Sequence, residues 1–149
     1  MAITQAMATS FKVEILDGVH NFGVGVVRAS TAADTFYIAL YTSAATLDAT
    51  TTAYTTSGEV VGTGYTAGGN TLAVSVVPVS SGTTAYLSFS NSSWSTATIT
   101  ARGAMIYNST QGNKCVAVLD FGADKVSTAG TFTIVFPTAA AGTAIIQIA

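Results

Sequence analysis

The feature that most constrains the fold of this chain is a two-residue alternation of apolar side chains in short segments. In the first of them, Phe36, Ile38 and Leu40 alternate with residues of the opposite face, a pattern typical of a β-strand. The predicted strands are Phe36–Tyr41, Leu72–Val77, Ala85–Phe89, Ile99–Met105, Cys115–Phe121, Phe132–Phe136 and Ala144–Ile148. A shorter stretch over Val24–Arg28 would be an eighth strand in addition to these seven.

Turn-forming residues separate these segments. The separators are Gly68–Asn70, Ser80–Gly82, Ser109–Asn113, Gly122–Gly130 and Pro137–Gly142. Short strands divided by such turns favour an antiparallel β-sandwich or jelly roll over a fold of alternating strands and helices. Pro78 predicts that the strand before it lies at a sheet edge or exit, since proline cannot donate to a ladder. The longest irregular stretch, Thr42–Gly69, predicts a long surface loop.

The first residues follow a different period. Ile3, Met7, Phe11 and Ile15 recur every four residues, which predicts an amphipathic helix over 3–17, with Gly18 as its terminator. Such a helix would pack on its own sheet or reach a neighbouring subunit as an arm. The predicted organisation is therefore an N-terminal helix or arm at 1–18 and one β-sandwich domain at 19–149.

Charge is scarce in this chain. Of its 149 residues only 8% are charged, against a usual value of about 25%, and the mean hydropathy is +0.51. No apolar run is long enough for a membrane-spanning helix, and the N-terminus lacks the pattern of a secretory signal. Two explanations stay open: a subunit with a face buried against neighbours, or a well-filled β core beneath a surface of Thr, Ser and Gly.

The few functional-group side chains do not form a catalytic or metal-binding pattern. The five cations are dispersed, which disfavours direct nucleic-acid binding, and Cys115 is a single cysteine in an apolar run, where we expect it to be buried. His20 has only Asp17 and Ser10 as sequence neighbours, and we expect it to cap the helix end. Asp120 and Asp124 share a turn but lack a calcium-loop pattern. We therefore predict a non-enzyme without catalytic, cofactor-binding or metal-binding residues.

Arg102 lies in the middle of a predicted strand that is otherwise uncharged. Burial of an arginine requires a partner, and Asp120 on the next strand is the natural internal candidate. The alternatives are a carboxylate across a subunit contact, or an arginine that faces outward along the sheet.

Several segments resemble a family of small virion proteins of tailed bacteriophages. They are Asp34–Thr42, Glu59–Gly69, Ile99–Asn108, Val116–Lys125, Gly130–Pro137 and Ile145–Ile148, so that the resemblance spans nearly the whole chain. It implies a structural protein of the virion, assembled in the cytoplasm of the host bacterium, and it carries over no active-site residues.

Within that family we expect a capsid decoration, or cement, protein that binds the major capsid protein and copies of itself, as a trimer or dimer. It would bind neither nucleic acid nor a membrane directly. Aromatic residues dominate interface energetics, so the predicted contact residues are Phe11, Tyr54, Tyr65, Trp94 and, as a paired cation, Arg102. The alternatives are a tail, neck or fibre-base component, and a receptor- or carbohydrate-binding module that uses its tyrosines as a platform.

Overall fold

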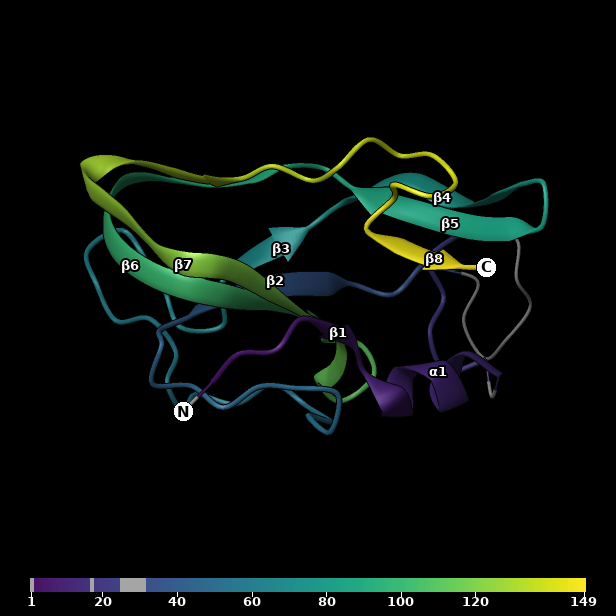
Figure 1. The fold of residues 1–149 in the computed structure, drawn as a ribbon, viewed down its shortest axis with the longest axis horizontal. Helices are drawn as coiled ribbons and strands as arrows, with labels where there is room; N and C mark the ends of the chain where they lie inside the picture. Colours follow the sequence, from purple (N-terminus) through teal and green to yellow (C-terminus); the bar gives the residue numbers. More distant parts are fainter. Residues whose placement is uncertain (1, 17, 25–31) are drawn as a thin grey trace.

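The fold consists of two antiparallel sheets. The computed structural model describes residues 2–16, 18–24 and 32–149. Its elements are β1 (Ala6–Met7), α1 (Thr9–Leu16), β2 (Phe36–Tyr41), β3 (Asn70–Leu72), β4 (Val74–Ser81), β5 (Thr84–Phe89), β6 (Ser92–Asn108), β7 (Lys114–Ile134) and β8 (Ile146–Ile148). The five-stranded sheet has the order β1-β7-β6-β2-β3 and the three-stranded sheet the order β4-β5-β8 (Figure 1). The predicted all-β class is confirmed.

The hairpin of β6 and β7 is the largest element, with strands of 17 and 21 residues. Its ladder shifts register at three places between Trp94 and Gly103, where β-bulges add residues to one strand and bend it. Figure 1 shows the two strands turning back together at the end of the molecule away from the three-stranded sheet. The predicted turn at Gly122–Gly130 is therefore wrong: Gly122 has the positive φ of a turn residue (76°), but it lies inside β7. The two strands predicted on either side of it are one.

The predicted helix over 3–17 is too long. Among the described residues of this range, only Thr9–Leu16 is helical, while Ile3 forms a parallel bridge with Leu47 and β1 pairs with β7. The physical reason is that residues four apart also lie on the same face of a β-strand, because side chains alternate every two residues along a strand. Ile3 and Met7 therefore lie on one face of an extended chain as readily as on one face of a helix.

Other predictions can be compared strand by strand. β2 matches its predicted range, and Pro78 lies in β4, which is an edge strand as predicted. The 42–69 segment has no strand of its own, as expected of a long loop, and forms isolated bridges instead. The strand predicted over Val24–Arg28 falls mostly outside the described residues.

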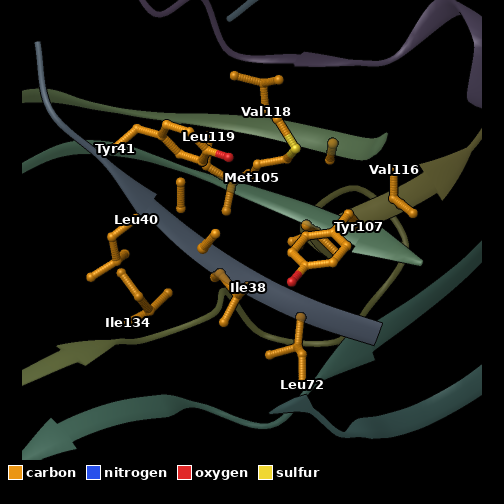
Figure 2. Close-up of a cluster of buried hydrophobic side chains, with 14 of the residues drawn as sticks. Ile38, Leu40, Tyr41, Leu72, Met105, Tyr107, Val116, Val118, Leu119 and Ile134 are labelled. Atoms are coloured by element: carbon orange, nitrogen blue, oxygen red, sulfur yellow. The ribbon is translucent and has the colours of Figure 1, made fainter. Parts of the chain in front are cut away.

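The core lies over the five-stranded sheet. Figure 2 shows Ile38 and Leu40 of β2 together with Met105 of β6 and Val118 of β7, all of which are buried. Cys115 is also buried, as the apolar run around it predicts.

Aromatic rings connect this core to the three-stranded sheet. Phe36 of β2 stacks on Phe22 with ring centroids 4.5 Å apart, and Phe89 of β5 contacts Phe36 at 5.9 Å. The two sheets thus share one hydrophobic cluster.

Gly69 lies at the end of the 42–69 segment, and comparing its substitution with that of Gly82 shows how closely this segment packs on β2. Gly69 and Gly82 both have positive φ (75° and 58°), but an added Cβ at Gly69 would overlap the carbonyl oxygen of Ile38, whereas Gly82 has open space. We expect Gly82→Ala to lower the free energy of unfolding by about 1–2 kcal/mol, from backbone strain alone. Gly69→Ala should cost about 3 kcal/mol or more, because overpacking adds to the strain. Urea unfolding measures both, and equal losses would contradict this packing.

Candidate functional site

The structure places two of the five predicted contact residues inside the subunit. Phe11 is 0% exposed and Trp94 is 4% exposed, so both are core side chains. Tyr54, Tyr65 and Arg102 are partly buried. As placed here, Phe11 and Trp94 offer no surface to a partner, whereas the other three keep some exposed area. The contact role of all five stays a prediction.

Tyr54 and Tyr65 meet at a buried carboxylate that the sequence analysis did not single out. Glu59 is 8% exposed; its Oε2 accepts a hydrogen bond from the Tyr54 hydroxyl (2.7 Å), and its Oε1 accepts from the Tyr65 hydroxyl (2.6 Å) and from the Gly68 N–H (2.7 Å). Three donors satisfy the carboxylate without an ion pair among the described contacts. Hydrogen bonds to a charged group are stronger than neutral ones, so this cluster holds its three partners firmly.

Tyr107 adds a fourth ring to this cluster. Its hydroxyl donates to the Gly68 carbonyl (2.7 Å), and its ring stacks between Tyr54 (4.8 Å between centroids) and Tyr37 (5.6 Å). The three rings cover each other's faces. A sugar-binding platform needs exposed ring faces, so this stack does not favour the carbohydrate-binding alternative.

Burial and the Glu59 charge both oppose ionisation of the surrounding tyrosines. Burial is the larger cause and the negative charge of Glu59 the second, and together they raise the pKa of Tyr107 to about 12. The pKa values of Tyr41, Tyr54 and Tyr65 are raised further, again chiefly by burial. For Tyr54 and Tyr65 the second cause is the hydrogen bond to Glu59.

These shifts predict a loss of stability at alkaline pH. A tyrosine whose pKa is higher in the folded state stabilises the fold fully below its unfolded pKa of about 10. That contribution falls as the pH rises from about 10 through the folded value, about 12 for Tyr107. The urea midpoint should fall as the pH is raised across this range. In the folded protein, the phenolate absorbance should stay below that expected for tyrosines with a pKa of about 10, until the protein unfolds. Ionisation of Tyr107 near pH 10 in folded protein, identified by difference from Tyr107→Phe, would contradict the prediction.

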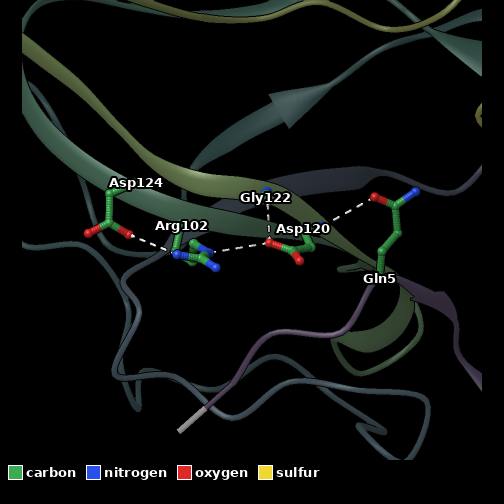
Figure 3. Close-up of polar contacts among 5 residues, drawn as sticks. All are labelled: Gln5, Arg102, Asp120, Gly122 and Asp124. Carbon is green, nitrogen blue, oxygen red and sulfur yellow. Dashed lines mark hydrogen bonds and ion pairs between the residues drawn. The ribbon is translucent and has the colours of Figure 1, made fainter.

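Arg102 forms the internal pair expected from the sequence. Its Nε lies 3.5 Å from Oδ1 of Asp120, and its Nη1 lies 3.8 Å from Oδ1 of Asp124 (Figure 3). Asp120 Oδ1 also accepts from the Gly122 N–H at 2.9 Å. The two carboxylates considered for calcium thus face a guanidinium, and no cluster of metal-ligating side chains occurs among the described residues.

The Arg102 pair should contribute little to stability. The side chains of Arg102 and Asp120 are 38% and 29% exposed, so water screens their attraction. We expect Arg102→Met to change the free energy of unfolding by less than about 1 kcal/mol, similar to Lys125→Met as an exposed control. A loss of several kcal/mol in urea unfolding would show that the pair is an essential buried contact.

His20 packs inside a polar and aromatic cluster. Its ring meets Phe11 edge-on (4.8 Å between centroids), and its Nδ1 lies 3.0 Å from the Asn108 amide nitrogen. Asn108 is fully buried and also donates to Oδ2 of Asp34 (2.8 Å). An amide therefore stands between the imidazole and this carboxylate, which is not the direct contact of a Ser-His-Asp triad. Asp17, one of the neighbours considered from the sequence, lies outside the described residues.

A groove of about 450 Å³ opens beside this cluster. α1, residues 20–24 and the strands of the small sheet line it, with Phe22, Val77, Leu87 and Ile146 among its apolar side chains. Among the described residues that line the groove, none is an aspartate, glutamate, lysine or arginine. No sequence pattern predicts this groove, because its walls come from segments that are distant along the chain.

Comparisons with protein-family models, with curated proteins and with solved structures found no match to this chain. Among the helices in the described part of the chain, none is long and apolar enough to cross a bilayer.

Proposed function

We propose that this chain is a structural subunit of a bacteriophage particle, and more specifically a capsid decoration protein that binds the major capsid protein. The observation that carries this proposal is the set of large apolar side chains left exposed on a chain with so little charge. The exposed side chains are Val24, Val61, Val77, Val79, Val126, Val135 and Ile148. Apolar surface of this kind is stabilised when a neighbouring subunit covers it, by about 25 cal/mol per Å².

The exposed side chains occur at both ends of the molecule. Val61 (97% exposed) and Val126 (65%) lie on either side of the bend of the β6–β7 hairpin. Two residues after Val61, the Thr63 carbonyl accepts a hydrogen bond from the Thr98 N–H of β6 at 2.9 Å, and Val126 of β7 pairs with Thr100 of β6. Val77 lies on β4 of the small sheet, at the other end (Figure 1). A rigid body with an apolar surface at each end is suited to bridge two neighbours, which is the task of a decoration protein.

The bent hairpin also supports a finer description of the fold. We propose a jelly-roll-like sandwich, because strands that bend at β-bulges form the corners between packed layers. Trp94 of β6 packs against Phe132 of β7 and against Tyr65, with ring centroids 6.2 Å and 6.0 Å away, respectively. In this arrangement α1 and the 42–69 segment would support the contact surface rather than reach out as free arms.

Copy number in purified particles tests the proposal. A decoration protein would be present in on the order of hundreds of copies per particle, as expected from the symmetry of a shell, whereas a tail, neck or fibre-base ring would contain about a dozen. Quantitative mass spectrometry of the phage that encodes the chain distinguishes these cases. Absence from the particle would end the proposal.

The exposed valines give a second test. We expect the double variant Val61→Glu and Val126→Glu to weaken binding to shells that lack the protein by at least about tenfold, because it places two charges in an apolar contact. Thr83→Glu adds a charge at the exposed β4–β5 turn and serves as the control. Binding is measured by co-sedimentation with the shells, after circular dichroism shows that the variants fold. Equal weakening by Thr83→Glu would contradict the role of the valines.

A further inference from the structure

The five-stranded sheet ends in two very short strands. β1 pairs with only two residues of β7, Ala117 and Val118, and β3 pairs with only three residues of β2, Phe36–Ile38. The neighbouring backbone of β7 and β2 would therefore present free N–H and C=O groups, which are a template for pairing with another chain.

Residues 52–54 cover the beginning of β7, at Asn113–Cys115. Ala53 forms an antiparallel bridge with Lys114. On either side of it, the Cys115 N–H donates to the Thr52 carbonyl and the Tyr54 N–H donates to the Asn113 carbonyl, each at 2.9 Å. The loop thus continues the edge where β1 stops.

Residues 58–65 cover the exposed part of β2. The Val60 N–H donates to the Leu40 carbonyl and the Thr42 N–H donates to the Gly58 carbonyl, each at 2.9 Å. The Leu40 N–H, which faces the same side, donates to the hydroxyl of Tyr65 at 2.9 Å. A side chain here takes the place of a strand, and no further partner is needed on this side of Leu40.

Glu59 holds these covering residues together. Its carboxylate joins Tyr54, which follows the β7 cover, to Tyr65 and Gly68, which lie over β2. Tyr41 of β2 also donates to the Thr55 carbonyl at 2.6 Å. One buried side chain therefore connects the covers of both edges.

We infer that residues 52–69 form a guard that closes two stretches of the edges of the five-stranded sheet, Asn113–Cys115 and Leu40–Thr42, against strand pairing with a second copy of this chain, and that the Glu59 carboxylate is its clasp. The guard lies between β2 and β3 in the chain, so its displacement would leave the strand ladders of both sheets intact. This inference does not depend on the particle to which the subunit belongs.

The test compares Glu59→Ala with Asp48→Ala by amide hydrogen exchange on the full chain. Asp48 is the matched control, because it lies in the same loop and its Oδ1 accepts only local hydrogen bonds, from the N–H (2.7 Å) and hydroxyl (2.6 Å) of Thr50. In Glu59→Ala the Leu40 and Val60 amides should exchange at least about tenfold faster, since hydrogen bonds to a charged group are lost. The amides of Ile106 and Val118 should keep their protection, and sedimentation velocity should show concentration-dependent self-association. Asp48→Ala should show neither change.

Three results would overturn the inference. Unchanged exchange at Leu40 would show that Glu59 is not the clasp. Equal acceleration at Ile106 and Val118 would show that the guard does not open separately from the sheet. Faster exchange at Leu40 in a variant that stays monomeric would show that the covered edges are not held against self-pairing. If Glu59→Ala does not fold, Tyr65→Phe removes the hydroxyl that accepts from the Leu40 N–H and donates to Glu59, and this variant is judged by the same outcomes.

Discussion

The structure depends on one backbone ladder, the pairing of β6 with β7. This ladder begins in the five-stranded sheet, passes through a bend and continues beyond it, so that a single hairpin forms most of the framework. Between the pairs Ala101–Lys125 and Gly103–Asp120, β6 advances by two residues and β7 by five. The extra residues produce the bend without ending the hairpin. Arg102 lies within this step on β6 and contacts Asp120 and Asp124 of the facing stretch of β7.

The scarcity of charge is reflected in how this chain stabilises the buried carboxylate of Glu59 in the 42–69 loop. A buried anion is costly unless it is satisfied, and an arginine or lysine is the usual partner. Around Glu59 the donors are instead two phenols and a glycine N–H. Neutral donors bring no second charge into the core, so only one ion has to be desolvated. The cost is that the surrounding tyrosines become hard to ionise, because the nearby negative charge adds to the effect of their burial.

The sequence predicts local elements better than their connections. The alternation over Phe36–Tyr41 and the position of Pro78 at an edge are both correct, since each is a property of one strand and its own residues. Gly122 fails as a turn signal, because the same positive φ serves a turn and a bulge, and the choice depends on the partner strand. Ile3 and Met7 fail as a helix signal for the reason of even spacing. The pairing of Arg102 with Asp120 was predictable from its midstrand position and the order of strands. Glu59 was not, because its partners lie five to nine residues away in a loop without periodicity.

The molecule has two kinds of surface, sheet edges and exposed apolar side chains, and each would support a different mode of association between subunits. Residues 52–69 cover the edges of the large sheet at Asn113–Cys115 and Leu40–Thr42, and the edge strand β4 carries Pro78 and two register shifts, which also oppose strand addition. What stays open is side-chain surface: the valines at the hairpin bend and the apolar groove beside α1. Strand pairing between subunits has little side-chain selectivity and extends without limit, whereas contact between shaped apolar surfaces is specific and ends when each surface is covered. A subunit that must bind a fixed number of neighbours is better served by the second kind, and the placement of Glu59 explains how this chain excludes the first.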